Sequence, residues 1–218
     1  MALKSEIEAQ QRWRMAHFPP DLHRLMDNAF MQLKQGNWAQ QALQVGAKLP
    51  SMQLKDINGA SFDPCRLVGR QPMIVSFFCG HWSLYCNLEL RAFDALVPQM
   101  QGFGARFIPI VTQSVELNIS TLRCNRLNYP LFADATLDAA AACGLLMTLP
   151  EMMIDALEQL GIDIPQRNGQ AVMPMPANYL VDLDGRIVAA HVDEDLRHRP
   201  EPEALLHALR QLYADRVN

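Results

Sequence analysis

The chain has 218 residues, of which 50% are hydrophobic and 19% charged, and its formal net charge is -4. That length is enough for one good-sized domain with an appendage. No run of Lys or Arg stands out, so nucleic acid and anionic membranes are poor partners. No stretch is long and apolar enough to span a bilayer, and the N-terminal residues contain no apolar signal segment, so we expect a cytoplasmic location.

The cysteines do not form the pattern of a disulfide framework or of a metal site. There are five, irregularly spaced: Cys65, Cys79, Cys86, Cys124 and Cys143. No Cys-x-x-Cys or His-x-x-x-His pair is present, so a closed zinc site is not expected. Cys65, Cys124 and Cys143 are expected to be buried, inert thiols, because free Cys is among the most buried residue types.

Residues 1–45 are predicted to be helical. Asp21 is expected to cap a helix that has one apolar face and ends at Gly36, and a short helix over 38–43 follows. We expect these helices to pack on the main domain or on a second subunit. Beyond them, the Asn58-Gly59 dipeptide predicts a hairpin between short strands at 52–54 and 61–62.

The middle of the chain alternates between strands and helices. Strands are predicted at 73–78, 106–112 and 131–133, and helices at 83–102, 114–127 and 136–143. The region 145–172 interrupts this alternation with a Met-rich helix, from Pro150 to Gly161, and a surface loop around 165–170. A hairpin around Asp184-Gly185, joining 179–182 to 186–192, and a helix over 201–214 complete the chain. The alternation predicts an α/β fold with a mostly parallel central sheet, which the terminal hairpin makes mixed.

The stretch from 73 to 90 carries the chemistry that the sequence suggests. A buried apolar run, 73–78, ends at Cys79-Gly80-His81-Trp82, and a helix is predicted to open with Ser83-Leu84-Tyr85-Cys86. The free N–H groups and the dipole at a helix start favour a thiolate, which lowers the pKa of a cysteine there. If the protein is an enzyme, we therefore expect the reaction at Cys86.

Four segments resemble peroxiredoxin-like proteins of the alkyl hydroperoxide reductase/thiol-specific antioxidant family. They are VGAKLPSMQLKDINGASF, SFFCGHWSLYCNLELRAF, NGQAVMPMPANYLVDLDGRIVAAHV and DEDLRHRPEPEALLHAL. The resemblance implies a thioredoxin-like fold over 46–218, with a helical insertion at about 145–172 and a separate N-terminal helical extension over 1–45. A fold does not by itself determine an activity, so the residues of the site need their own argument.

The chain departs from the family where the chemistry would be decided. In one bacterial branch the helix usually opens Trp-Cys-Pro-Tyr-Cys, whereas here Ser83 replaces the first cysteine, so a local dithiol pair is impossible. Typical peroxiredoxins carry Pro-x-x-x-Thr-x-x-Cys, and Cys79-x-x-x-Ser83-x-x-Cys86 keeps the spacing of the hydroxyl and the thiol. Ser83 would donate a hydrogen bond to the thiolate or to a bound peroxide; the alternative is that it only caps the helix.

The resemblance also suggests roles for neighbouring residues. Cys79 stands where the branch has arginine and could be the resolving thiol, or only a small buried residue. His81 could hydrogen-bond the thiolate, or be an exposed loop residue. Pro176 resembles the proline, usually in cis, that faces the active-site cysteine, and with Trp82 it would form a platform for a partner.

The arginine that typical peroxiredoxins place near the cysteine has no counterpart at 174–178. Arg199 matches the branch's arginine-bearing segment better than Arg197 does. Arg199 would either reach the pocket of Cys86 or form a surface salt bridge to Asp193 or Asp195, and the second role is the one expected from the local sequence.

The resemblance implies an antioxidant oxidoreductase that reduces hydrogen peroxide or organic hydroperoxides through Cys86, with no cofactor and no metal. Thioredoxin, glutaredoxin or glutathione would regenerate the thiol, and a homodimer is possible from family habit. The alternative is a catalytically degenerate thioredoxin-fold protein that acts as a binding or redox-sensing module, which the loss of the first cysteine favours.

Overall fold

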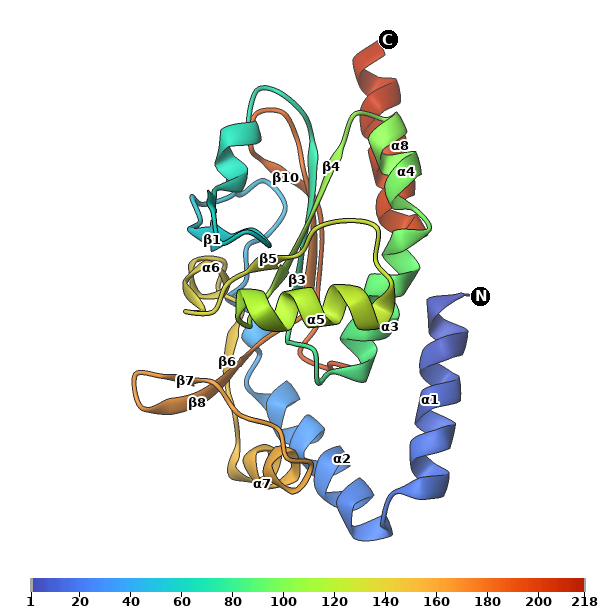
Figure 1. Ribbon diagram of the computed structural model, residues 1–218, viewed down its shortest axis with the longest axis vertical. Coiled ribbons are helices and arrows are strands. Elements are labelled where there is room, and N and C mark those ends of the chain that lie inside the picture. The colour runs from blue at the N-terminus through green and yellow to red at the C-terminus, as the bar shows by residue number, and fades with distance from the viewer. Residues whose placement is uncertain (1, 218) are drawn as a thin grey trace.

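Strand β3 (Met73–Phe78) lies in the middle of a seven-stranded mixed sheet in the computed structural model, which describes residues 2–217 (Figure 1). It is parallel to β4 (Arg106–Val111) and antiparallel to β9 (Ala177–Val181). The sheet order is β10-β9-β3-β4-β5-β1-β2, in which β10 is Ile187–Val192, β5 is Phe132–Ala133, β1 is Leu54–Lys55 and β2 is Ser61–Phe62. The predicted mixed sheet and both predicted hairpins, β1–β2 and β9–β10, are confirmed. The expectation that the sheet is mostly parallel is wrong, because among the described strands only the pairs β3–β4 and β4–β5 are parallel, and β9 and β1 join them antiparallel.

All six residues of β3 are buried, which explains why its sequence is an apolar run rather than an alternation. Helices cover both of its faces. Helices α4 (Val97–Gly102) and α8 (Glu203–Val217) lie side by side on the right of the sheet in Figure 1. Helix α5 (Val115–Asn125) crosses in front of the lower part of the sheet, and α6 (Asp138–Ala142) lies on its left. Because β3 and β4 are parallel, their C-terminal ends lie side by side at one edge of the sheet. The next helix, α3 (Leu84–Asp94), starts at that edge.

The predicted helix over 83–102 is two helices, α3 and α4. Pro98 lies in the first turn of α4, where its missing N–H is tolerated. In a continuous helix that N–H would have to donate to the carbonyl of Asp94, so the proline favours a break after α3.

The N-terminal helices pack on the main domain. α1 (Leu3–His17) contacts α3, and α2 (Pro20–Gln35) contacts α7 (Glu151–Gln159) of the insertion. Pro19, not Asp21, is the residue that precedes α2; Asp21 lies in its first turn and pairs with Arg24. The predicted helix over 38–43 is one 3-10 turn, Trp38–Gln40.

The insertion over 145–172 contains strands as well as the expected helix. β6 (Leu146–Thr148), β8 (Gln170–Pro174) and β7 (Gln166–Arg167) form a three-stranded sheet. The surface loop predicted around 165–170 is wrong: it is a hairpin whose turn is Asn168-Gly169, with φ of 52° and 76°. Two consecutive positive φ angles are what a tight hairpin turn requires, and Asn-Gly supplies them at little cost.

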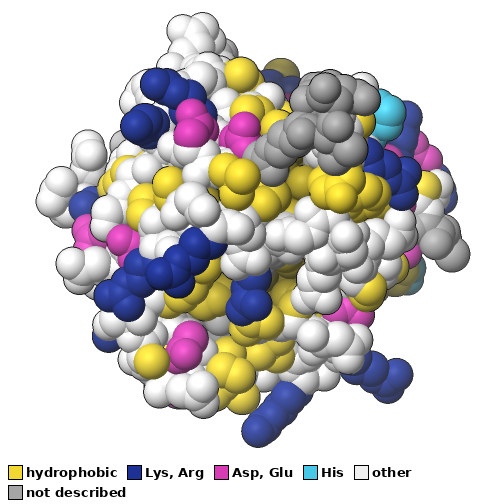
Figure 2. Space-filling model, turned by 90° about the horizontal axis from the view of Figure 1, so that it is seen from above, with side chains coloured by type: hydrophobic (Ala, Val, Ile, Leu, Met, Phe, Trp, Pro, Cys, Tyr) yellow, Lys and Arg dark blue, Asp and Glu magenta, His cyan; other side chains and the backbone are white. Residues whose placement is uncertain are grey.

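None of the helices in the described part of the chain is long and apolar enough to cross a membrane. On the face shown in Figure 2, acidic and basic side chains are dispersed among apolar and neutral ones. That face therefore offers no extended field of one sign.

A buried carboxylate ties α2 to the loop between β10 and α8. Asp195 is 1% exposed and accepts from Nε of Arg197 at 2.8 Å, while Nζ of Lys34 on α2 lies 3.1 Å away. Arg197 also pairs with Asp27 of α2 at 2.9 Å, and its guanidinium stacks over Phe30. The bonds to Arg197 and Lys34 outweigh the effect of burial and lower the pKa of Asp195.

We expect Asp195→Asn to lower the free energy of unfolding at pH 7 by about 2 kcal/mol, because it removes the buried charge that accepts hydrogen bonds from the partly exposed Arg197 and Lys34. Since the pKa of Asp195 is lowered in the folded state, the contribution is complete above its usual value of 3.8 and declines as the pH falls below it. Urea unfolding at pH 7 and pH 3 should therefore show a difference between wild type and variant that shrinks at the lower pH. The control is Asp21→Asn, which removes an exposed ion pair with Arg24 on α2 and should change the free energy of unfolding little. Equal effects of the two substitutions would contradict this assignment.

Candidate active site

Cys86 lies in the first turn of α3, directly after the central strand. Ser83 caps the helix, and its Oγ accepts from the backbone N of Cys86 at 3.3 Å. The loop between β3 and Ser83 is held by the residues that follow β4: Thr112 Oγ1 donates to the carbonyl of Cys79 at 2.8 Å. Because β3 and β4 are parallel, both loops leave the same edge of the sheet, the usual location of sites in such folds.

Buried charges surround the Cys86 sulfur, and the side chain of Cys86 is itself 1% exposed. Nη2 of Arg199 lies 3.7 Å from the sulfur. Nε of Arg199 forms an ion pair with Oε2 of Glu89 at 2.9 Å, and both side chains are 1% exposed. The other carboxylate oxygen of Glu89 accepts from Nδ2 of Asn178, on β9, at 2.9 Å. Arg199 thus joins α3, β9 and the loop before α8.

These neighbours set the ionisation of Cys86. Burial alone raises its pKa, but the hydrogen bond from Cys79, the charge of Arg199 and the hydrogen bond from Ser83 together outweigh burial. The pKa of Cys86 is lowered from 9.0 to about 5. The N–H groups at the start of α3 act in the same direction. Cys86 is therefore a thiolate at neutral pH.

Cys79 keeps its proton. Its hydrogen bond to Cys86, its burial and the charge on Cys86 raise the pKa of Cys79 well above the usual value, against the opposing charge of Arg199. Its sulfur also lies 3.3 Å from the carbonyl oxygen of Pro174. A thiol has one proton to donate, and the bond to a charged acceptor is the stronger. That proton therefore points to Cys86 when Cys86 is ionised.

Glu89 shares the positive charge of Arg199 with the thiolate. Burial raises the pKa of Glu89 to about 7, although Arg199 and Asn178 oppose the rise. Near neutral pH the carboxyl is thus protonated in a large fraction of molecules. When Glu89 is neutral, the whole charge of Arg199 is available to stabilise the thiolate of Cys86.

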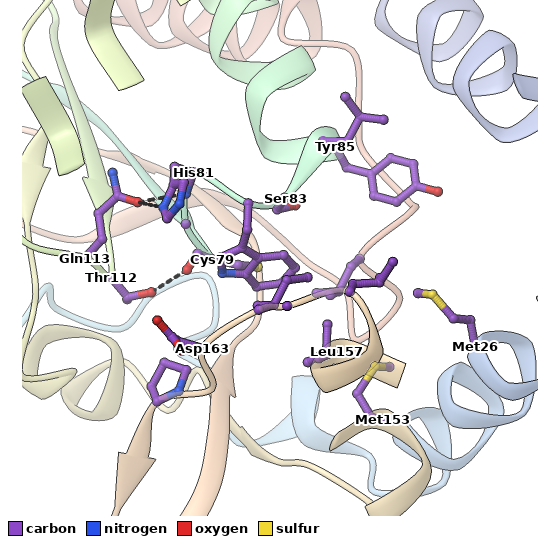
Figure 3. A pocket seen from close by; sticks show the side chains of 18 of the residues that line it. Met26, Cys79, His81, Ser83, Tyr85, Thr112, Gln113, Met153, Leu157 and Asp163 are labelled. Carbon is purple, nitrogen blue, oxygen red and sulfur yellow. Dashed lines mark hydrogen bonds between the residues drawn. The ribbon is translucent and has the colours of Figure 1, made fainter. Parts of the chain in front are cut away.

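A pocket of about 590 Å³ opens beside these residues (Figure 3). Its wall includes Cys79, Trp82 and Ser83 and extends to apolar side chains of α2 and α7. Among the described residues, Cys86, Arg199 and Pro176 do not line it; they lie behind the wall. The pocket therefore reaches Cys79 and the residue that caps α3, but not Cys86.

His81 points away from the thiolate. Its backbone N donates to Oε1 of Gln113 at 2.7 Å, and its ring lies against the same amide, as Figure 3 shows. His81 is exposed, so of the two roles considered for it the exposed loop residue is the one the structure has.

Pro176 does not have the cis peptide bond that the resemblance suggests, since no peptide bond among the described residues is cis. The platform at Pro176 stays a prediction. The proline that contacts a site thiol is Pro174, through its carbonyl oxygen.

The surface salt bridge expected for Arg199 is also wrong. Arg197 makes the pair with Asp195, and His198 lies against Asp193, while Arg199 turns inward.

The remaining cysteines differ from one another. Cys143 is buried, and burial raises its pKa to about 12. Cys65 is half-buried, and Cys124 is exposed, so the expectation that all three are buried fails at Cys124. In the described part of the chain no group of three or more His, Cys, Asp or Glu side chains is arranged to hold a metal ion.

Glu89 and Asn178 are site residues that sequence reasoning missed. Glu89 lies three residues after Cys86, hence on the same face of α3, and between two buried leucines. A glutamate on an apolar helix face next to a reactive cysteine was the available signal. Asn178 carried no signal of its own, because its role depends on the pairing of β9 with β3.

The fold and the position of the reactive cysteine define a protein of the thioredoxin-like, peroxiredoxin type. The model of the AhpC/TSA family matches residues 45–190, well over half of the chain. The chain therefore belongs to the AhpC/TSA family, and the resemblance seen in the sequence is confirmed.

Solved peroxiredoxin structures share the fold at low identity. Peroxidoxin BcpB from Mycobacterium tuberculosis is 19% identical with a TM-score of 0.60, covering 78% of this chain and 97% of that one. AhpC from Mycobacterium tuberculosis is 15% identical with a TM-score of 0.61, covering 80% and 95%. Peroxiredoxin Q from Xanthomonas campestris is 17% identical with a TM-score of 0.58, covering 79% and 99%. No relative was found among curated proteins.

We expect Arg199→Gln to raise the pKa of Cys86 by about one to three pH units, because it removes the opposite charge beside the sulfur. Glu89→Gln removes a competing negative charge and should lower that pKa or leave it unchanged. The ultraviolet absorbance of the thiolate, followed against pH in a Cys124→Ser background, measures both without requiring access to the sulfur. A thiolate titration that Arg199→Gln does not move would show that the guanidinium is only structural.

Proposed function

We propose that this protein is a thiol peroxidase in which Cys86 attacks the peroxide. The observation that carries the proposal is the buried thiolate, held at 3.7 Å from Nη2 of Arg199 and hydrogen-bonded by Cys79 and Ser83. Membership of the AhpC/TSA family supports the same class of reaction. A thiolate, not a thiol, is the nucleophile that such a reaction needs at neutral pH.

In the first step the sulfur of Cys86 attacks one oxygen of the hydroperoxide, and the O–O bond breaks. Sulfur loses two electrons and becomes a sulfenic acid, while the second oxygen leaves as water or an alcohol after taking up a proton. The hydroxyl of Ser83, on the pocket side of Cys86, is placed to hydrogen-bond the peroxide at this point. Arg199 stabilises the thiolate before the attack.

In the second step Cys79 acts as the resolving thiol. Its sulfur condenses with the sulfenic acid of Cys86, an S–S bond forms and water leaves. Support for this role is that each of the two thiols shifts the pKa of the other, so they are close enough to interact. A thiol reductant such as thioredoxin, glutaredoxin or glutathione would then reduce the disulfide, and it would approach from the side of Cys79, because Cys79 lines the pocket and Cys86 does not.

A specific observation favours a second candidate, a binding or redox-sensing module. Cys86 is buried and does not line the pocket, so access of a peroxide depends on movement of the residues that cover it. If that movement is slow, Cys86 would be oxidised without efficient turnover.

A homodimer and the division of the chain at residue 45 likewise stay predictions.

We expect one equivalent of hydrogen peroxide to convert the reduced protein to a Cys79–Cys86 disulfide, seen by mass spectrometry as the loss of two hydrogens in the joined peptides. Cys79→Ser should instead accumulate a sulfenic acid at Cys86 that a sulfenic-acid trap captures. Cys86→Ser should lose peroxide turnover in the presence of a thiol reductant. Cys124→Ser, at an exposed thiol, is the matched control and should keep the wild-type rate.

Other results would count against the proposal in distinct ways. Turnover that survives Cys86→Ser would remove Cys86 as the nucleophile. If the trap captures as much sulfenic acid in the wild type as in Cys79→Ser, Cys79 is not the resolving thiol. If peroxide oxidises Cys86 many times more slowly than it oxidises Cys124, the peroxidase proposal is wrong and the binding or redox-sensing module is the remaining function.

A further inference from the structure

One side of the pocket is built from helices that lie outside the family match. Trp13, Arg14 and Phe18, in and after α1, form one side together with Met26 and Phe30 of α2. These residues precede residue 45, where the match to the AhpC/TSA family begins. The opposite side comes from α7 and the residues after it. The residues of α1 and α2 are therefore the part of the wall that the family match does not cover.

Most of the pocket wall is apolar and flexible. Met26 of α2 and Met153 of α7 lie near each other in Figure 3, with Leu157 of α7 beyond Met153. Methionine side chains adapt to irregular apolar ligands. A volume of about 590 Å³ is within the range of sites that enclose small molecules.

One cation in this wall lacks an anionic partner. Arg14 donates from Nη1 to the hydroxyl of Tyr85 at 2.8 Å and from Nη2 to the sulfur of Met26 at 3.2 Å. Its Nε is buried and has no hydrogen-bond partner, and its guanidinium lies 5.5 Å from the ring centroid of Phe18. No carboxylate in the described part of the chain forms an ion pair with it, whereas Arg197 and Arg199 each have one.

Placing an unpaired guanidinium in an apolar wall costs desolvation free energy. An anion bound against the guanidinium would offset that cost. Its planar fork of N–H groups matches the geometry of a carboxylate. The position of Arg14 follows from its partners, since Tyr85 and Met26 lie together at one end of the pocket in Figure 3. Asp163, His81 and Gln113 lie toward the other end.

We propose that this pocket binds an amphipathic monocarboxylate, with the carboxylate on Arg14 and the hydrocarbon chain along Met26, Met153 and Leu157. One anionic group fits and a second does not, because Asp163 would repel an anion at the far end. The inference concerns binding and does not require that Cys86 react. It gives the N-terminal helices a role in selecting the ligand.

Sodium decanoate is the probe, and the reduced protein is used in the absence of peroxide, so the result is independent of turnover. Trp13 and Trp82 line the pocket, so tryptophan fluorescence reports occupancy, and titration calorimetry gives the affinity and the stoichiometry. We expect saturable binding of one decanoate per chain and weaker binding of decanol, which has the same chain without the charge.

Arg14→Gln should weaken decanoate binding roughly tenfold or more, the effect of losing a hydrogen bond to a charged group. It should leave the binding of decanol nearly unchanged. Arg12→Gln, on the same helix but outside the pocket wall, is the matched control and should bind as the wild type does. If Arg14→Gln is destabilised, Arg14→Lys tests the same point, because it keeps the charge and should retain part of the affinity.

Three results would overturn the proposal: no saturable binding of decanoate, equal binding by Arg14→Gln and wild type, or decanol that binds as tightly as decanoate. Since none of these measurements uses the thiols, failure here leaves the proposed peroxidase untouched. Conversely, loss of peroxidase function in the cysteine variants leaves this site standing.

Discussion

The buried guanidinium of Arg199 is the charge on which the arrangement of the site depends. It lies 3.7 Å from the sulfur of Cys86 and 2.9 Å from a carboxylate oxygen of Glu89, with both acids out of contact with water. In such surroundings one positive charge cannot fully stabilise two negative ones, so the more weakly held acid takes up a proton. That acid is Glu89, whose pKa rises to about 7 while that of Cys86 falls. The same contacts hold α3, β9 and the loop before α8 together.

Replacement of the first helix cysteine by Ser83 changes the chemistry of the site without emptying it. The hydroxyl keeps the cap of α3, and Cys79, from the preceding loop, brings a second thiol against Cys86 from another direction. A dithiol is thus present, with its proton on Cys79 and its charge on Cys86. The N-terminal helices and the insertion then build a pocket that ends at Cys79 and Ser83. Cys86 itself lies outside the lining of this pocket.

Much of the fold follows from local signals in the sequence. The buried strand over 73–78 was predictable to the residue because a short apolar run followed by a glycine loop has few alternatives. The turns at Asn58-Gly59 and Asp184-Gly185 were predictable because these dipeptides accept the positive φ that a tight turn needs. Asn168-Gly169 carries the same signal, and its hairpin was missed only because polar neighbours suggested a loop. The position of Cys86 in the first helical turn was likewise available.

Only the tertiary structure decided which charges meet. Glu89 and Arg199 are far apart in the chain. The resemblance favoured Arg199 over Arg197, but the local sequence predicted a surface salt bridge for Arg199, and it is Arg197 that forms the partly exposed pair. By itself, the sequence determined the type of fold and the cysteine to consider, because strand runs, turns and helix starts are encoded by neighbouring residues. Burial determined the roles of Arg199 and of the unpaired Arg14, because the strength of a charge depends on how far water is excluded from it, and that exclusion exists only once distant segments have packed.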